Sequence, residues 1–442
     1  MSKDAEKGSK PQENAKSYAP PPSNAVTHPT NFCETLIHLF KGNIGPGLFA
    51  MGDAFKNGGM ILAPILTIFI AIVSVHCQHI LLSCSKRVKE IQKTEECPDY
   101  AETVEKCFEM GPPKLRRCAG IMRTSVNIFI CVTQLGFCCI YFVFITSNIT
   151  QILHSYGFGW DRRLVMMIAF LPILLPSLIT KLKLLSPVSL IANICMLFSL
   201  IVTMYYALRE KMPDIKERSM VTTPGQLALY FGTAIFAFEG IALVLPLMNE
   251  MKKPSNFDRS FGVLNVGMTL VTLLFSFAGF FGYWKWGEEV GGSLTLNLPH
   301  HWLADVVKTL VSVGVLLGYP LQFFVAIQIM WPNVLKLCNC KKPLIGELFF
   351  RAALVILTFL IAEFVPNLGL FISLIGALCS TTLALVFPPL IELILRNENS
   401  KGPGVMVFIK NIVILLVALL GFATGSYESI ANMIREFQTN GL

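Results

Sequence analysis

Charged side chains are scarce in this sequence. Asp, Glu, Lys and Arg make up 14% of its 442 residues, whereas apolar residues make up 53%. Soluble domains carry about 25% charged residues, so the composition excludes an ordinary soluble protein and predicts a multi-pass protein of the lipid bilayer. The formal net charge is +8, but the Lys and Arg residues lie in loops between apolar segments, and we expect no nucleic-acid partner.

Other residue types are missing from particular regions. Residues 1–31 contain almost no apolar side chains and therefore predict a disordered tail, with no signal-peptide core before the first apolar segment. The thirteen cysteines lie mostly in apolar segments or in loops that we assign to the cytoplasm, so we expect no disulfide framework. The paired histidines, such as His76 with His79, lack a third ligand nearby. We therefore predict no metal, no cofactor and no enzymatic centre.

Eleven apolar segments of membrane-spanning length follow the tail. Their ranges are 32–56, 59–83, 119–150, 164–179, 187–208, 225–247, 261–286, 302–331, 347–364, 368–395 and 405–427. Loops with an excess of Lys and Arg, such as 86–117 and 252–259, alternate with loops that are poorer in positive charge. The positive-inside rule assigns the basic loops to the cytoplasm.

This orientation divides the chain into three parts. Residues 1–31 form the predicted cytoplasmic tail, residues 32–428 the membrane domain, and residues 429–442 a short tail on the outer or luminal side. Asn148, in the sequon Asn148-Ile149-Thr150, falls on the outer side and is a candidate glycosylation acceptor.

The first apolar segment contains the stretch GNIGPG at 42–47, with three glycines and one proline in six residues. Glycine removes side-chain packing and proline removes a backbone donor, so this stretch predicts an interruption near mid-membrane, between half-helices over about 32–41 and 48–56. Irregular backbone at that depth must be surrounded by protein or line a water-filled cavity. The freed N–H groups favour a carboxylate and the freed carbonyls opposite favour an ammonium group, which predicts a site for a zwitterion.

Segments one to five and six to ten can be superposed in opposite orientations, because five is an odd number. This is the condition for an inverted repeat. Segment six should then be interrupted as well, and its stretch FGTAIFAFEG at 231–240 has Gly232 and Gly240 bracketing the intramembrane Glu239. A single glycine in a membrane helix usually reflects packing, but interruptions at corresponding positions of two halves predict a binding site between them.

Motifs along the chain carry a family resemblance. IHLFKGNIGPG at 37–47, TQLGFCCIYFVF at 133–144, FGTAIFAFEG at 231–240 and GSLTLNLP at 292–299 resemble the proton-coupled amino acid transporters of the amino acid/auxin permease family. The resemblance covers about 32–427. It implies an all-α, LeuT-type fold of eleven transmembrane helices in a five-plus-five inverted repeat, with helices 1 and 6 broken. It also implies symport of amino acids and protons, and a plasma-membrane, lysosomal or late endosomal location.

Ionisable residues inside the membrane are functional candidates, because charge at that depth is costly. His38 lies about one turn before the first break, and the resemblance implies a role in proton coupling. The alternative is a neutral histidine that is hydrogen-bonded between helices. Glu239 either takes part in proton coupling or supports the hinge. Asp53 and Lys56 are three residues apart, so we expect them to pair on one helix face as part of a gate or as structure.

The predicted substrate-binding residues lie at the two breaks and on segment eight. They are Gly42, Asn43, Gly45, Gly47, Thr233, Phe236, Phe238 and Tyr319. The three aromatic residues have packing as an alternative role. Since no arginine and no carboxylate besides Glu239 lies near the breaks, we predict small neutral amino acids such as glycine, alanine and proline as substrates.

The predicted driving ion is the proton. A sodium site in this architecture would, by analogy, need paired hydroxyls on segment eight, and residues 314–331 contain no Ser or Thr. The sequence departs from the family at Pro46, where many members carry threonine, and at Gly52, where many carry proline. We expect transport by alternating access. A second function class stays open, an amino acid sensor with little flux that signals through the loop 86–117.

Overall fold

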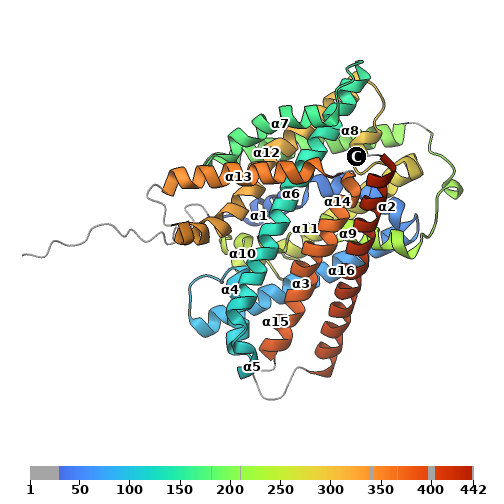
Figure 1. Ribbon diagram of the computed structural model, residues 1–442. Helices are drawn as coiled ribbons and strands as arrows, with labels where there is room; N and C mark the ends of the chain where they lie inside the picture. The colour runs from blue at the N-terminus through green and yellow to red at the C-terminus, as the bar shows by residue number, and fades with distance from the viewer. Residues whose placement is uncertain are drawn as a thin grey trace, which may run out of the picture.

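The computed structural model describes residues 29–180, 182–209, 211–338, 343–365, 367–396 and 404–440. This part of the chain is a helical bundle without a β-sheet (Figure 1), in which a single parallel bridge joins Thr30 to Met251. The predicted N-terminal tail lies outside the described residues as far as His28. The first half of the chain forms α1 (Phe32–Asn43), α2 (Pro46–Gly58), α3 (Leu62–Gln92), α4 (Tyr100–Met110), α5 (Pro113–Arg116), α6 (Ala119–Ser155), α7 (Arg162–Ser177) and α8 (Leu182–Arg209). The second half forms α9 (Pro224–Ala237), α10 (Ile241–Asn249), α11 (Val263–Trp286), α12 (Trp302–Cys338), α13 (Pro343–Glu363), α14 (Leu368–Ile375), α15 (Phe387–Arg396) and α16 (Val405–Asn440).

Nine spans in the described chain are long and apolar enough to cross a bilayer. The two remaining predicted segments are shorter pieces. One is the pair α1 and α2, of 12 and 13 residues, and the other is α7, of 16 residues. The all-helical membrane fold is as predicted, whereas the count of eleven spans stays a prediction.

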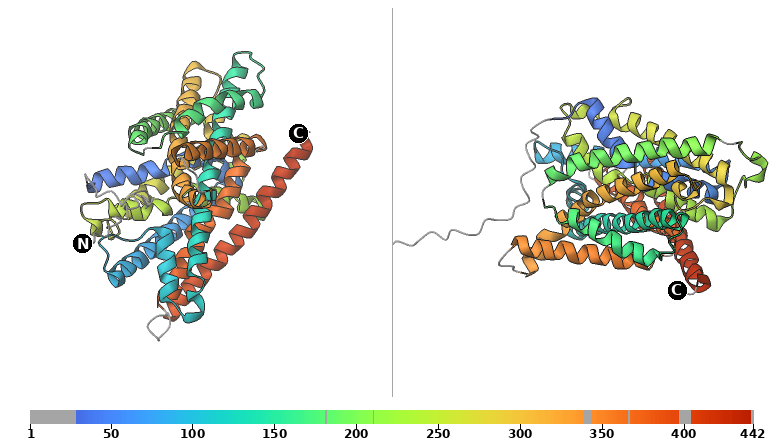
Figure 2. Two further views of the ribbon diagram at one scale, coloured as in Figure 1. Left: turned by 60° about the vertical axis from the view of Figure 1, so that its left-hand side comes forward. Right: turned by 90° about the horizontal axis from the view of Figure 1, so that it is seen from above.

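The centre of the bundle is built around α2 and α9, which pack against each other. Twelve of the thirteen residues of α2 are buried, compared with three of the twelve residues of α1. Small residues permit this packing, because a Cβ on Gly47 would lie 2.9 Å from the Cα of Ala237. The long helix α16 instead runs along the outside of the bundle to the C-terminus (Figure 2), and only 22% of its most apolar window is buried.

The first predicted break exists but is shorter than expected. Helix α1 continues to Asn43 and α2 begins at Pro46, so only Ile44 and Gly45 interrupt the helix. The predicted boundaries near 41 and 48 were wrong because Pro46 occupies the first position of α2. A proline fits there, since the N–H groups of the first helical turn have no intrahelical partner.

The second break also exists, at Phe238, Glu239 and Gly240, between α9 and α10. Gly232 does not bracket it as predicted, because α9 runs unbroken through this residue to Ala237. A Cβ at Gly232 would collide with the backbone of Ser373 on α14. Gly232 therefore serves the close approach of two helices, a role that the sequence cannot distinguish from a helix break.

The tenth span is irregular in its middle. Between α14 and α15 lie two π-helical turns, η5 (Gly376–Ser380) and η6 (Thr382–Val386). Isolated π-turns within α-helices occur often at functional sites. The first of these turns packs directly against α9, since a Cβ on Gly376 would collide with the carbonyl group of Gly232.

The C-terminal boundary differs from the prediction. The predicted outer tail began at residue 429, but α16 continues without interruption to Asn440. At about 1.5 Å per residue this helix of 36 residues is longer than the hydrocarbon core of a bilayer, about 30 Å thick. The end of the chain is thus a helical extension of the last span.

Candidate functional site

The two helix breaks lie next to each other in the middle of the bundle. Gly47, in the first turn of α2, lies against Ala237 at the end of α9. Gly240, at the start of α10, lies beside Asn43 at the end of α1, where a Cβ would come within 3.3 Å of the Asn43 Oδ1. Four helix ends therefore converge on one place, as the inverted-repeat prediction required.

These helix ends leave backbone groups free. The N-terminal residues Gly45 of α2 and Gly240 of α10 carry no side-chain cap, so the first N–H groups of both helices lack a protein partner. The last carbonyl groups of α1 and α9 lack one for the same reason. The ends of the helix dipoles add partial positive charge at α2 and α10 and partial negative charge at α1 and α9.

Several buried polar side-chain atoms on the helices that meet here also lack a hydrogen-bond partner. They are Asn43 Oδ1, Gln134 Oε1, Thr233 Oγ1 and Glu239 Oε2. An unpaired buried polar group is costly unless a ligand or water satisfies it. Space for such a ligand exists at the first break, because a Cβ on Gly45 would meet no atom within 4 Å. The arrangement suits a small molecule with one positive and one negative group.

The predicted aromatic residues fall into two groups. The Phe236 ring lies 4.9 Å from Phe137 of α6, edge to face, beside the second break. Phe238 instead packs 5.2 Å from Phe275 of α11. Tyr319 is fully buried and its hydroxyl lies 2.8 Å from the Thr358 hydroxyl on α13. Phe236 is therefore a wall of the break region, whereas Phe238 and Tyr319 have the packing contacts of the alternative role. Their part in substrate binding stays a prediction.

Sequence reasoning missed one helix face that borders the site. Gln134, Phe137 and Tyr141 follow each other at intervals of three and four residues and so lie on one face of α6. Phe137 contacts Phe236, and the Tyr141 ring lies 6.4 Å from Tyr319 of α12. The motif that contains these residues was recognised, but it carries no break or charge that would have singled out individual side chains. Helical periodicity was the available signal.

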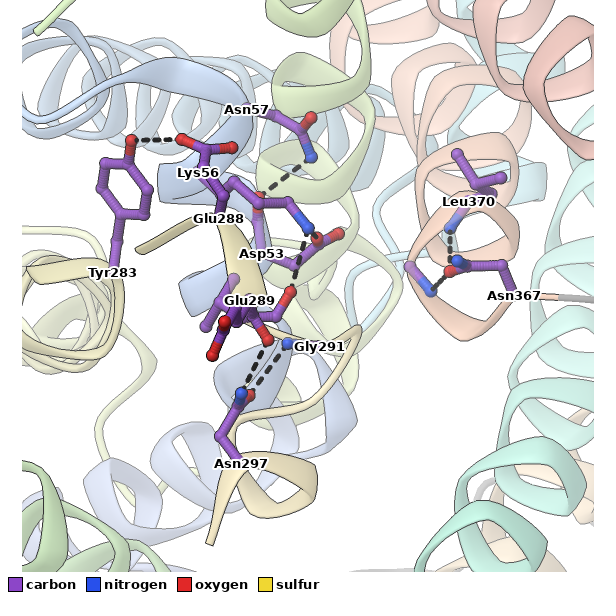
Figure 3. A network of polar contacts seen from close by, with 12 residues as sticks. Asp53, Lys56, Asn57, Tyr283, Glu288, Glu289, Gly291, Asn297, Asn367 and Leu370 are labelled. Carbon is purple, nitrogen blue, oxygen red and sulfur yellow. Dashed lines mark hydrogen bonds and ion pairs between the residues drawn. The ribbon is translucent and has the colours of Figure 1, made fainter. Parts of the chain in front are cut away.

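The side of the bundle on which α2 ends (the α2 side) is closed above the breaks. Asp53 and Lys56 form the predicted pair, with a distance of 2.8 Å between Nζ and Oδ1, and Lys56 also donates to the carbonyl of Val290. Figure 3 shows this network at the segment that joins α11 to α12. Leu294 of that segment fills the space that a side chain at Gly52 or Gly282 would need.

The opposite side, on which α1 begins (the α1 side), is more open. His38 and Gly42 are exposed on α1, and Gly45 and Glu239 are half-buried although they lie at the breaks in mid-bundle. Since the α2 side is closed, a cavity must reach these two residues from the α1 side. His38 lies along this side and not at the break itself, and its role in proton coupling stays a prediction.

Asn148 does not have the environment of a glycosylation acceptor. It lies inside α6, fully buried, and its amide group donates to the Phe144 carbonyl while its Oδ1 accepts from the Thr295 hydroxyl. Glycan transfer needs an accessible acceptor, so this environment argues against glycosylation. The helix extends five residues beyond the sequon, to Ser155, which is why a sequon at the edge of an apolar run was misleading.

No group of three or more metal-ligating side chains is found among the described residues. His79 Nε2 lies 2.7 Å from the Asn265 Oδ1, whereas His76 Nε2 is buried without a partner. The two histidines therefore do not share one ligand site.

Comparisons with known proteins agree with this geometry. The family described as "Transmembrane amino acid transporter protein" matches residues 28–431. The "Proton-coupled amino acid transporter-like protein pathetic" of Drosophila melanogaster is 35% identical over 415 residues, which cover 93% of this chain and 87% of that protein. The "Probable amino acid transporter skat-1" of Caenorhabditis elegans is 25% identical over 432 residues, which cover 95% and 93% of the two chains.

Solved structures share the fold at low sequence identity. The inward-facing conformation of Mhp1 matches with a TM-score of 0.61 at 12% identity, over 95% of this chain and 94% of that chain. A manganese transporter of Eremococcus coleocola matches with a TM-score of 0.52 at 11% identity, over 94% and 95%. The LeuT-type fold is therefore as predicted. Since the family match runs along nearly the whole chain and the relatives are transporters and not enzymes, the chain belongs to the family of transmembrane amino acid transporter proteins.

Proposed function

We propose that this protein is a symporter that carries small neutral amino acids together with protons by alternating access. The observation that carries the proposal is the meeting of four unpaired helix ends beside an empty space at Gly45. A zwitterion is the simplest solute that satisfies both the N–H and the carbonyl ends of such a site.

Each pole of the substrate has its own partners in this proposal. The carboxylate accepts from N–H groups at the start of α2, near Gly45 and Gly47, and the ammonium group donates to the carbonyls that end α1, near Gly42 and Asn43. Thr233 supports this site from α9, where its hydroxyl is buried and unpaired.

The side chain of the substrate must be small and uncharged. Gly47 is in contact with Ala237, and Phe236 with Phe137, so little volume is left beside the breaks. The charged pair Asp53 and Lys56 neutralises itself on the α2 side and is not offered to a substrate. Glycine, alanine and proline are therefore the proposed substrates.

The proton is the proposed driving ion, with Glu239 as the carrier at the break and His38 on the access path. Glu239 is half-buried, and its Oε2 has no partner, so a proton can reach the carboxyl group and satisfy it. The naming of the Drosophila relative as proton-coupled supports this choice, as does the absence of Ser and Thr from residues 314–331 of α12.

The open α1 side corresponds to a state that faces the cytoplasm, since the basic loops put this side inside the cell. Substrate and proton enter from the opposite compartment when the Asp53–Lys56 closure opens. The proposed location is the plasma membrane or the lysosomal or late endosomal membrane, where an acidic outer or luminal side can drive the flux.

The test is uptake of labelled alanine by the purified protein in sodium-free proteoliposomes. An inward proton gradient should accelerate uptake, a protonophore should abolish the acceleration, and glycine and proline should compete whereas lysine and glutamate should not. Uptake that required sodium, or that preferred lysine or glutamate, would contradict the proposal. Measuring alanine binding on the same preparation separates a transporter from a sensor, which would bind alanine without flux.

A further inference from the structure

The π-helical turn η5 brings a second polar side chain to the break that holds Glu239. Ser380, the last residue of η5, is fully buried, and its hydroxyl has no hydrogen-bond partner. It lies close enough to the Glu239 carboxyl group to interact with it electrostatically. Two unpaired polar groups, Ser380 Oγ and Glu239 Oε2, thus face one another from the tenth and sixth spans.

Leaving both groups unpaired costs free energy in a buried environment. A small rotation of the serine hydroxyl, or one bridging water, would satisfy both at once. The backbone holds Ser380 in place for this purpose, since η5 is packed against α9 at Gly376 and Gly232. The position of Ser380 relative to the break is therefore fixed by the helix crossing.

The other groups around Glu239 do not offer the same service. Tyr100 of α4 and Cys379 of η5 interact with it, but the Tyr100 hydroxyl is already donated to the Leu383 carbonyl. Both are weak acids that stay neutral near neutral pH. Helices α9 and α10 contribute no charged side chain.

The charged and titratable groups on the remaining neighbouring helices are occupied or lie elsewhere. Asp53 and Lys56 of α2 pair with each other, and His38 lies on the exposed face of α1. Lys41 of α1 has an interaction of its own.

We propose that Ser380 positions the proton on Glu239 during transport. This inference rests on the proposed proton symport. When Glu239 is ionised, the Ser380 hydroxyl donates to the carboxylate. When a proton from water on the open side binds the carboxylate oxygen, the hydroxyl accepts from the new O–H group. A hydroxyl is both donor and acceptor, so one residue serves both states.

The sign of the effect follows from the ionised state. A hydrogen bond to the carboxylate favours its charged form, so removal of the hydroxyl makes Glu239 easier to protonate. In the Ser380→Ala variant the pH of half-maximal alanine uptake should rise by about one unit, equivalent to about a tenfold lower proton concentration. The Ser380→Thr variant retains the hydroxyl and should keep the wild-type midpoint.

The experiment measures alanine uptake against outside pH for wild type, Ser380→Ala, Ser380→Thr and the control Ser312→Ala. Ser312 is also a buried serine, but it lies on α12 and bonds only to the Lys308 carbonyl of its own helix. The control should keep the wild-type midpoint. A Ser380→Ala midpoint equal to that of the control would overturn the inference.

Two further variants keep the result decisive. If Ser380→Ala does not fold, Ser380→Cys replaces it, because a thiol is a weak donor and should give a smaller shift in the same direction. In a Glu239→Gln background the Ser380→Ala change should cause no further shift, and an unchanged shift there would also contradict the inference. Wild-type uptake without any proton dependence would instead refute the proposed symport, so the two failures are distinguishable.

Discussion

At the scale of single residues, two glycines of the first break differ in what surrounds them. Gly45 faces empty space, and its backbone angles, φ −156° and ψ −162°, are open to any residue. Gly47 instead faces the backbone of Ala237 at 2.9 Å. The first glycine leaves room for substrate, and the second allows two helices to touch.

This contrast gives a paired prediction. Gly45→Ala should fold normally and place a methyl group in the site, so proline and alanine uptake should fall more than glycine uptake. Gly47→Ala should push α2 from α9 and lower the free energy of unfolding by about 1–3 kcal/mol. The measurements are competitive uptake and the melting temperature in detergent. Equal loss of glycine and proline uptake in Gly45→Ala would show that the space at this residue does not hold the substrate.

At the scale of elements, the two inner half-helices are tied together at their ends on the α1 side. The N–H of Thr30, just before α1, donates to the Glu250 carbonyl after α10, and the N–H of Lys252 donates back to the Thr30 carbonyl. Helix α1 also packs along α10, where Gly42 receives the Leu243 side chain. We therefore expect α1 and α10 to move as one unit.

Two cross-links test this expectation in a background without the exposed Cys33 and Cys338. Oxidising a Thr30→Cys/Met251→Cys pair should leave alanine uptake in place, because the linked helices already move together. Oxidising a Gly52→Cys/Leu294→Cys pair should stop uptake, and a reductant should restore it, because this link fixes the closed α2 side. Inhibition by the first link would mean that α1 and α10 separate during the cycle.

The elements also show how far the sequence could predict the site. Both breaks were predicted because Gly and Pro act locally on the backbone, and the Asp53–Lys56 pair was predicted because three residues is a helical interval. The role of Gly232 and the burial of Asn148 were not, since each depends on a helix from a distant part of the chain. Ser380 was missed for the same reason, because no local pattern announces a π-turn that faces Glu239.

At the scale of the whole molecule, the two sides of the bundle are in different states. Val290 and Leu294 are almost completely buried on the α2 side, whereas His38 is exposed on the α1 side. A transporter caught in this state admits water from one side only.

Labelling in sealed vesicles of known orientation tests this asymmetry, again without Cys33 and Cys338. His38→Cys should react with a membrane-impermeant maleimide supplied from the α1 side, and Val290→Cys should stay protected from a reagent on the α2 side. Leu416→Cys, on an exposed and strongly apolar part of α16, serves as a control for residues that face lipid and should not react. Reaction of Val290→Cys at the same rate as His38→Cys would contradict a single open side.

The π-helical turns of the tenth span have one more consequence. A π-turn holds one residue more than an α-turn, so η5 and η6 store surplus chain within a helix that is otherwise regular. Removing one residue from Thr382–Val386 would let that turn relax to α geometry, while Ser380, which precedes the deletion, would keep its direction. Everything downstream would rotate by about 100°, and Glu392 of α15 would turn away from its ion partner Lys410 on α16. The extra residue is thus what keeps the two ends of this span in phase, one facing the centre of the molecule and the other facing its last helix.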